Sequence, residues 1–228
     1  MMNDLKQHVE FDIDFKRNPY KGKFIVLEGI EASGKTTQVN LLGKALPDAI
    51  LTKNPTDGQI GSFIRKEVLG GKSDIPPVAY QYLFAADREI QQQEIIKYLK
   101  DGKTVISDRY FWSSVAYGIA DREGVDYENW EEVSLVALSL LSMYHQFLLP
   151  DLSVHLNISL DESSKRIAGS KKHTEIYDNH KMNIKIEKGY DWLIKKFPKE
   201  FVIVDGDGKR KEGEITKEIL KLIEAIKK

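Results

Sequence analysis

One short run of residues has the types and the spacing that bind phosphate. Residues 29–36 read GIEASGKT and match the pattern G-x-x-x-x-G-K-[ST]. In such a loop the glycines let the backbone wrap so that successive N–H groups face a phosphate at the positive end of the following helix. Lys35 would reach the terminal phosphates and the Thr36 hydroxyl would hold Mg²⁺. The residues expected to contact the nucleotide phosphates are Gly29, Ile30, Glu31, Ala32, Ser33, Gly34, Lys35, Thr36 and Thr37.

A carboxylate and a guanidinium follow another apolar run. Residues 104–106 have the pattern of a strand, and Asp108 and Arg109 come two and three positions after it. Because ligands of parallel sheets bind at the carboxyl ends of the strands, both side chains are candidates for the site. Asp108 would support Mg²⁺ there, and Arg109 would make a bidentate contact with a phosphate. The alternative is an Asp–Arg pair on the surface.

An aromatic side chain and a guanidinium share one face of an expected long helix. Phe84 and Arg88 are four residues apart, so they are neighbours on the helix surface. Together they would stack on a base and hydrogen-bond its carbonyl edge. The stripe formed by Leu83, Ala86 and Ile90 lies about 100° away and is expected to face the core. The alternative for Phe84 is an ordinary core position.

These candidates need strand ends and helix faces to bring them together. Short apolar runs alternate with helical patterns along the whole chain. Strands made of continuous apolar runs indicate a parallel sheet covered by helices on both faces. We therefore predict an α/β, three-layer fold with a central five-stranded parallel sheet. The expected strands are 24–27, 49–51, 104–106, 152–158 and 201–204, and the expected helices are 35–46, 78–99, 129–147 and one at the C-terminus that carries Ile215, Ile219, Leu222 and Ile226.

Composition narrows the class of protein further. The 228 residues include 34 Lys and Arg against 35 Asp and Glu, so the chain lacks the cationic excess of a nucleic-acid or membrane-surface binder. It has no cysteine, which excludes a disulfide framework and a thiolate metal site. No apolar run approaches the roughly 18 residues of a membrane span, and the charged N-terminus is unlike a signal peptide. We expect a cytoplasmic globular protein without nucleic-acid or membrane partners.

Three longer stretches resemble the thymidylate kinase family. Residues 24–38 (FIVLEGIEASGKTTQ) look like the opening of these enzymes, and residues 83–88 (LFAADR) are similar to their L-F-[AS]-x-[DN]-R helix. Residues 108–117 (DRYFWSSVAY) resemble their D-R-[YH]-x-x-S-x-x-A-[YF] segment, and Pro150-Asp151-Leu152 also fits. The resemblance implies a P-loop kinase fold. It also implies transfer of the γ-phosphoryl group of ATP to dTMP, giving dTDP, with ATP and Mg²⁺ as cofactors.

The resemblance also implies roles for single residues in the acceptor site. Phe84 would stack on thymine and Arg88 would bond its O4 side. Arg65 and Arg109 would bind the phosphate of the acceptor. Glu31 matches the acidic loop position that contacts the 3′-hydroxyl of the sugar. The residues expected to act in catalysis are Lys35, Arg109, Glu31 and Arg166.

Further acceptor contacts follow from the same alignment of motifs. Tyr117 would crowd the 2′ position and favour deoxyribose, and Pro55 and Ser113 would also contact the substrate. Ser114 stands where some members have an Asn that touches the base.

The chain departs from the family in two places. After the second strand the family often reads T-R-E-P-G-G-T, whereas residues 52–58 here read TKNPTDG, so Lys53 and Asn54 replace an Arg and an acid. The loop at 29–36 lacks the Arg that some members carry. In the branch of the family without this Arg, a lid supplies the cation. We expect this lid at about 161–180, with Arg166 as the cation on the ATP side and Lys171, Lys172 and His173 as further basic residues. The alternative for this basic run is a solvated face.

Two other functions fit the phosphate loop. A deoxynucleoside kinase of similar fold would need a carboxylate to take the proton of a 5′-hydroxyl, and such enzymes place it where this chain has Asn54. A non-catalytic P-loop module would bind nucleotide and signal to a partner. In a deoxynucleoside kinase Arg65 would lack a phosphate partner, and a non-catalytic module would not bind dTMP.

The rest of the expected organisation is a single kinase domain over 21–228 preceded by an extension, 1–20. In the extension Val9, Phe11, Ile13 and Phe15 alternate with acidic residues, which predicts either a half-buried strand or a loosely held tail. Family members are typically homodimers packed through helices. The apolar residues that would form such a surface, unless they belong to a buried core helix, are Val133, Leu135, Val136, Leu138 and Leu140.

Overall fold

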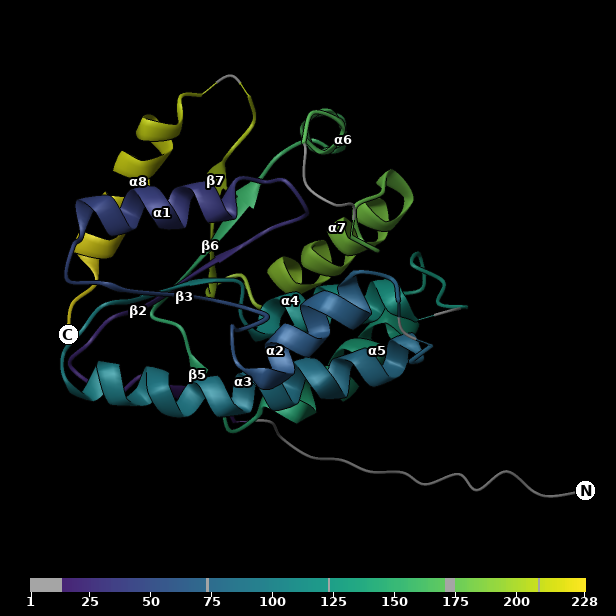
Figure 1. The fold of residues 1–228 in the computed structure, drawn as a ribbon, viewed down its shortest axis with the longest axis horizontal. Coiled ribbons are helices and arrows are strands. Elements are labelled where there is room, and N and C mark those ends of the chain that lie inside the picture. The colour runs from purple at the N-terminus through teal and green to yellow at the C-terminus, as the bar shows by residue number, and fades with distance from the viewer. Residues whose placement is uncertain (1–13, 73, 123, 171–174, 209) are drawn as a thin grey trace, which may run out of the picture.

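Five parallel strands form the centre of the molecule in a computed structural model, which describes residues 14–72, 74–122, 124–170, 175–208 and 210–228 (Figure 1). Their order across the sheet is β3-β4-β2-β6-β7. The strands are β2 (Phe24–Glu28), β3 (Ile50–Lys53), β4 (Val105–Asp108), β6 (Leu152–Asn157) and β7 (Phe201–Asp205). This arrangement confirms the predicted five-stranded parallel sheet, and each expected strand is present with ends that differ by one or two residues.

The central strand explains why a continuous apolar run is needed. All five residues of β2 are buried, because helices cover both faces of the sheet and β4 and β6 flank it on either side. In the register of the sheet Leu27 is paired with Asp108 of β4, and Glu28 is paired with His155 of β6. The carboxyl ends of these three strands therefore meet at one edge, where the phosphate loop begins.

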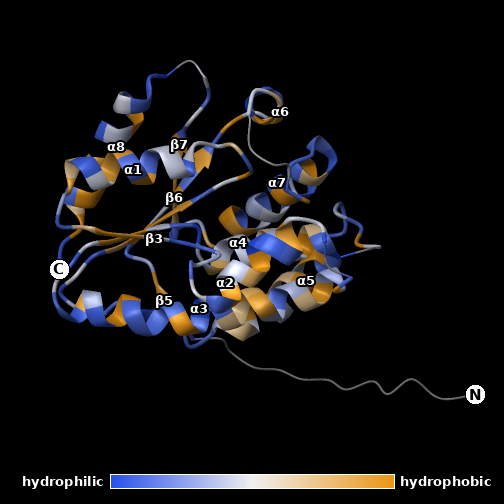
Figure 2. Cartoon of the chain, viewed as in Figure 1, coloured by the Kyte–Doolittle hydropathy of each residue, from blue (hydrophilic) through white to orange (hydrophobic). Residues whose placement is uncertain are grey.

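Two layers of helices complete the fold, one on each face of the sheet (Figure 1). Figure 2 shows that apolar and polar residues both occur along α3 and α5. The layer on one face consists of α1 (Lys35–Ala45) and α8 (Glu212–Ala225). The other layer consists of α3 (Pro77–Lys100), α4 (Phe111–Asp121), α5 (Trp130–Leu141) and α7 (His180–Lys196). Short elements at the margins are α2 (Gln59–Phe63), η1 (Ile64–Leu69), η2 (Ser142–Tyr144) and α6 (Leu160–Ala168).

Helix α4 is an element that the sequence did not reveal. Ten of its eleven residues are buried, since it lies between α3, α5 and α7 in the centre of its layer. A helix that is buried on nearly all sides carries few charged residues, and Asp121 is the only one in α4, so its sequence does not look like that of a surface helix. Helix α5 is also shorter than expected, because it ends at Leu141 and a 3₁₀ turn follows.

The expected core stripe of α3 is confirmed at Leu83, which packs partly buried against the core, and is wrong at Ala86 and Ile90. Ile90 is 61% exposed and Ala86 is also exposed, whereas Phe84 and Arg88 are buried. The face of α3 that turns inward carries Gln81, Phe84, Asp87, Arg88, Gln91 and Gln92. Because this face contacts a polar cavity and a polar loop, apolar periodicity gave the wrong side of the helix.

The described part of the N-terminal extension packs onto the domain. β1 (Lys16–Arg17) pairs in parallel with β5 (Leu148–Leu149), apart from the main sheet. The ring of Phe15 stacks on Phe111, with centroids 5.8 Å apart and planes 3° apart. The alternation predicted at Val9, Phe11 and Ile13 lies outside the described residues. Among the described helices, none is both long and apolar enough to cross a bilayer.

His155 is a buried titratable group on β6, away from the surface. Its side chain is 7% exposed, its ring lies 4.8 Å from that of Tyr190, and Nδ1 has no hydrogen-bond partner within the described residues. Burial lowers the pKa of His155 from 6.5 to about 4, and the positive charge of Lys35 adds to this effect. The folded protein therefore contains a neutral histidine at neutral pH.

This burial predicts a specific loss of stability in acid. Between pH 6.5 and 4 the unfolded chain takes up a proton at His155 that the folded chain does not, so stability falls as pH falls. At pH 5 the cost is about 2 kcal/mol relative to neutral pH. The substitution His155→Leu should remove that part of the pH dependence, measured as the free energy of unfolding in urea at pH 7.5 and pH 5.

The exposed His145 provides a matched control. His145→Leu should retain the pH dependence of the unsubstituted protein. Equal pH dependence in His155→Leu and in the unsubstituted chain would contradict the assignment.

Candidate active site

The phosphate loop follows β2 and ends at the first turn of α1. Gly29 has φ +142° and Gly34 has φ +96°, values that L side chains rarely adopt. A Cβ at Gly29 would lie 2.7 Å from the carbonyl oxygen of Leu156, so the loop also needs glycine there for space. These two glycines turn the chain so that α1 begins at Lys35. The wrapped conformation expected from the motif is therefore present.

Lys35 is folded against the loop that it would serve. Its Nζ donates to the carbonyl oxygens of Ile30 (2.7 Å) and Gly29 (3.1 Å) and to the Ser33 hydroxyl (3.1 Å). Burial lowers the pKa of Lys35 to about 8, so the ammonium group is still largely charged at pH 7. A bound phosphate would replace carbonyl partners of this cation with full negative charge.

Thr36 and Asp108 come together at the mouth of the same loop. The Thr36 hydroxyl donates to the Asp108 carboxylate across 2.5 Å. A hydroxyl and a carboxylate are hard oxygen ligands of the kind that Mg²⁺ uses in nucleotide sites, where phosphates and water supply most of its coordination. Within the described residues there is no cluster of three or more His, Cys, Asp or Glu that could hold a metal. The residues present therefore fit a nucleotide-bound Mg²⁺ and not a metal held by the protein alone.

Arg109 forms the centre of a charged cluster between the phosphate loop and α4. Its Nη2 donates to Glu31 at 2.6 Å, and its Nη1 lies 3.1 Å from the carbonyl oxygen of Gly29. The guanidinium also lies over the ring of Tyr117, 4.8 Å from the centroid, and the Tyr117 hydroxyl donates to the same Glu31 oxygen. Glu31 thus fixes a cation and a phenol at the point where the loop faces the rest of the cavity.

Beneath this cluster lies a buried carboxylate that the sequence did not single out. Glu28, at the end of β2, accepts the backbone N–H of Tyr110 and the hydroxyls of Ser113 and Tyr190. Burial raises the pKa of Glu28, and these hydrogen bonds together with the nearby charge of Arg109 oppose the rise. Arg109 itself has φ +71°, which is uncommon outside glycine. The hydrogen bond from the Tyr110 N–H to Glu28 therefore fixes the backbone directly after Arg109.

Phe84 and Arg88 line the other end of the cavity, as a pair. The Arg88 guanidinium lies 5.5 Å from the centroid of the Phe84 ring. Its Nη1 donates to the Ser114 hydroxyl at 2.7 Å, and its Nε lies 3.3 Å from Asn54 Oδ1. Ser114 therefore holds Arg88, a contact that the sequence did not suggest.

Arg65 of η1 and the loop after β3 lie in the same region of the cavity wall. Arg65 of η1 donates to the carbonyl oxygens of Pro55 and Thr56 and to Asp57. Asp87 of α3 accepts both the N–H and the hydroxyl of Thr56, at 2.8 and 2.6 Å. The loop is thus tied to α3 and η1, and Arg65 is held at the wall of the cavity.

Arg166 of α6 reaches the phosphate loop from the opposite side. Its Nη1 lies 3.2 Å from the carbonyl oxygen of Ala32, and its Nη2 donates to that of Gly206 at 3.0 Å. Glu162, one turn earlier, accepts its Nε at 2.7 Å. Helix α6 begins at the expected place, capped by Ser159, whose hydroxyl accepts the N–H of Glu162. Lys171, Lys172 and His173 lie outside the described residues.

These groups surround a single cavity of about 750 Å³. Gly29 and Ile30 do not line it; they shape the loop from behind and accept Lys35 through their carbonyl groups. Gln81, Tyr177 and Arg210 also line the cavity, and the sequence offered no motif for the last two. Gln81 is three residues before Phe84, so helical spacing would have found it. The predicted residues that line the cavity are Glu31, Ala32, Ser33, Gly34, Lys35, Thr36, Thr37, Pro55, Arg65, Phe84, Arg88, Asp108, Arg109, Ser113, Ser114, Tyr117 and Arg166.

Comparison with known proteins agrees with this geometry. A family model described as thymidylate kinase matches residues 27–219. The chain belongs to the thymidylate kinase family. It is 39% identical over 192 residues to a probable thymidylate kinase of Thermococcus onnurineus, which covers 79% of this chain and 88% of the relative. It is 33% identical over 192 residues to a thymidylate kinase of Caldanaerobacter subterraneus, covering 82% of this chain and 88% of that protein.

Solved structures of thymidylate kinases share the fold. The enzyme from Candida albicans, whose structure is described as revealing the origin of broad substrate specificity, superposes with a TM-score of 0.76 at 28% identity. The match covers 89% of this chain and 91% of that one. The expected resemblance is therefore confirmed, and the family reaction is phosphorylation of dTMP with ATP as donor.

Proposed function

We propose that the chain transfers the γ-phosphoryl group of ATP to dTMP by using the two ends of its single cavity for the two nucleotides. The observation that carries this proposal is that the phosphate loop with Lys35 and the pair Phe84–Arg88 line one continuous space, with Arg109 between them. ATP binds at the loop, with Arg166 over its phosphates. The dTMP base stacks on Phe84 and its O4 side faces Arg88.

The acceptor phosphate decides what the protein has to do. A phosphate monoester has a second pKa near ~6, so it is already anionic at pH 7 and needs no general base. The catalytic task is to hold two polyanions together and to neutralise the charge that spreads over the transferred group. Lys35, Arg109 and Arg166 supply positive charge to this group, and Arg65 with Arg109 holds the acceptor phosphate.

Mg²⁺ belongs to the same proposal, with Thr36 and Asp108 as the protein groups that would hold it. When bound, the ion would supply positive charge that offsets the negative charge of the phosphate groups. The residues of the chain contribute the rest: they orient both nucleotides and replace water around the phosphates. Asp108 already accepts the Thr36 hydroxyl in this structure, so both oxygen ligands face the same point.

The sugar of the acceptor would meet Glu31 and Tyr117. Glu31 is fixed by Arg109 and by the Tyr117 hydroxyl, and it faces the 3′-hydroxyl in our assignment. The Tyr117 ring would occupy the space that a 2′-hydroxyl needs, which favours deoxyribose. We also propose that the enzyme works in the cytoplasm, as the composition of the chain indicates.

A deoxynucleoside kinase is less well supported, because the carboxylate that would act as its general base is missing from the expected position. The position after β3 that would carry a carboxylate is Asn54, and its side chain is buried and donates to Gln91 at 2.8 Å. A non-catalytic module would leave the aligned cations without an acceptor phosphate. The three functions are therefore distinguished by measuring which acceptor is phosphorylated.

The first test offers dTMP and thymidine separately, with ATP and Mg²⁺, and measures ADP. We expect turnover with dTMP and none with thymidine, because the position after β3 that would activate a 5′-hydroxyl carries Asn54 instead of a carboxylate. Turnover of thymidine alone would favour the deoxynucleoside kinase. Slow ADP release that is independent of both acceptors would favour the non-catalytic module.

The second test removes the ring that would stack on the base. Phe84→Ala should raise the KM for dTMP by about fivefold to 150-fold, since base–aromatic stacking contributes about 1–3 kcal/mol. The KM for ATP should change little, because Phe84 lies at the opposite end of the cavity from the phosphate loop. Phe84→Tyr retains the ring and should keep most of the affinity. An unchanged KM for dTMP in Phe84→Ala would contradict the stacking role.

We propose that the enzyme is a homodimer packed through the outer faces of α3 and α5. Val133 and Leu140 are buried, so that part of the expected surface belongs to the core, whereas Leu135 is 73% exposed and Leu138 is exposed too. The exposed stripe of α3 adds apolar area on a second helix that also packs against α4. The large exposed apolar residues of these two helices are Val78, Tyr82, Ile90, Trp130, Leu135 and Leu138.

A charge on this face should separate the subunits. Ile90→Glu and Leu135→Glu should each shift the protein from dimer to monomer in sedimentation velocity, because a carboxylate would have to be buried without a partner. Ile203→Glu is the matched control, since Ile203 is an exposed apolar residue on the edge strand β7. A dimer that persists in both α3 and α5 variants would place the interface elsewhere.

A further inference from the structure

Gln81 has a polar atom that no other residue in the described part of the chain contacts by a hydrogen bond. It lies on α3 one turn before Phe84, lines the cavity and is only 4% exposed. Its Nε2 donates to Asp121 Oδ2 at 3.0 Å. Its Oε1 is buried and has no hydrogen-bond partner within the described residues. A buried amide oxygen without a donor is costly, so it indicates a partner that arrives with the ligand.

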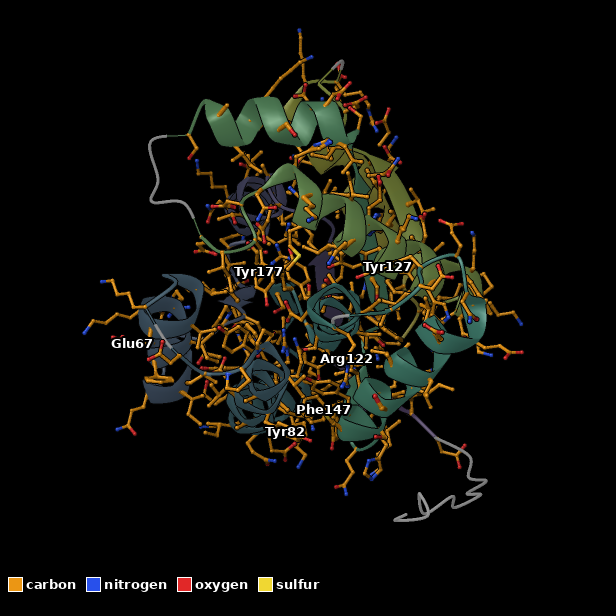
Figure 3. The ribbon with its side chains drawn as sticks, turned by 90° about the vertical axis from the view of Figure 1, so that its right-hand side faces the viewer. Glu67, Tyr82, Arg122, Tyr127, Phe147 and Tyr177 are labelled. Atoms are coloured by element: carbon orange, nitrogen blue, oxygen red, sulfur yellow. The ribbon has the colours of Figure 1, made fainter. Side chains whose placement is uncertain are left out.

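Asp121 fixes which atom of the amide remains for a ligand. It is the last residue of α4 and also accepts the hydroxyl of Tyr177 at 2.8 Å. Figure 3 shows Tyr177 in the interior of the molecule, consistent with its 2% exposure. An ionised carboxylate only accepts hydrogen bonds, so it orients the amide of Gln81 with nitrogen toward Asp121. Oε1 is then the atom left for a donor from the cavity.

Two other side-chain oxygens at the cavity already have a donor. Arg88 donates to Ser114 and lies within 3.3 Å of Asn54 Oδ1. Of Ser114, Asn54 and Gln81, only Gln81 has an oxygen that is left without a donor among the described residues. Its position three residues from Phe84 and seven from Arg88 places it on the same helix face as both. A base stacked on Phe84 would therefore have its polar edge within the reach of this face.

We propose that Gln81 Oε1 accepts the N3–H of thymine, and that Asp121 is a positioning residue that keeps this oxygen toward the base. The inference rests on the proposed function and adds to it a determinant of base specificity. Thymine and uracil each have a donor at N3, whereas cytosine has an acceptor there. An acceptor fixed in place thus pairs with dTMP and dUMP and faces the N3 lone pair of dCMP unfavourably.

The direct test replaces the amide by a thioether of similar length. Gln81→Met should raise the KM for dTMP and for dUMP by about tenfold while leaving the KM for ATP unchanged. The ratio of kcat/KM for dTMP to that for dCMP should fall by about the same factor. Gln93→Met is the matched control, since Gln93 is an exposed glutamine on the same helix. An unchanged ratio in active Gln81→Met enzyme would overturn the role of Gln81.

A second variant keeps the proposal testable if Gln81→Met does not fold. Asp121→Asn preserves shape but can either donate to or accept from the amide of Gln81, so the amide is no longer held in one orientation. We expect a lower preference for dTMP over dCMP with little change in the KM for ATP. An unchanged preference would contradict positioning by Asp121. An unsubstituted chain that does not phosphorylate dTMP would overturn the proposed function first, and this assignment with it.

The pH profile separates positioning from a purely structural role. Burial raises the pKa of Asp121 to about 6, and below that pH the protonated acid can donate to Gln81 Oε1 and release the orientation. The preference for dTMP over dCMP, a ratio in which the titration of the acceptor phosphate cancels, should fall as pH decreases through 6. It should not fall in this way in Asp121→Asn. The groups that face Asp121 are Gln81, Tyr80, Tyr127, Tyr177 and Lys185.

Discussion

The site depends on one buried carboxylate at the end of the central strand. Glu28 has no solvent exposure, and it accepts hydrogen bonds from the backbone of Tyr110 and from two hydroxyl groups on α4 and α7. A carboxylate in that position is stable only while these donors surround it. The same hydrogen bonds join β2, the connection after β4 and two helices. Arg109 lies in that connection, so its unusual backbone conformation is maintained by the burial of Glu28.

A second constraint is the balance between the positively charged side chains of the cavity and their partners. Arg109 is paired with Glu31, Arg166 with Glu162, and Lys35 with carbonyl groups of its own loop. Each of these three cations is therefore held at the wall of the cavity by a carboxylate or by carbonyl groups. Phosphate groups compete well for these cations because they carry more charge than a single carboxylate or a carbonyl dipole. We therefore expect these side chains to move little when two anionic nucleotides bind.

The strands could be predicted from the sequence because a parallel sheet covered on both faces leaves a simple record. Each strand is a short apolar run, and β2 is buried at all five positions. Helix α4 was not recognised, since it is buried at ten of its eleven residues and carries a single charged residue, unlike a typical surface helix. For α3 the apolar stripe chosen from the sequence was misleading, because Ile90 and Ala86 face outward while much of the inward face is polar and lines the cavity.

The site shows the same division. The phosphate loop and Asp108–Arg109 are local in sequence, so their spacing alone places them at strand ends. The acceptor end is assembled from α3, α4 and the segment before α7, whose residues are up to about a hundred positions apart. Tyr177 reaches Gln81 only through Asp121, a contact between three elements that no spacing rule contains. The proposed phosphate site is thus a continuous sequence motif, whereas the proposed base site is formed by side chains from separate elements that pack around α4.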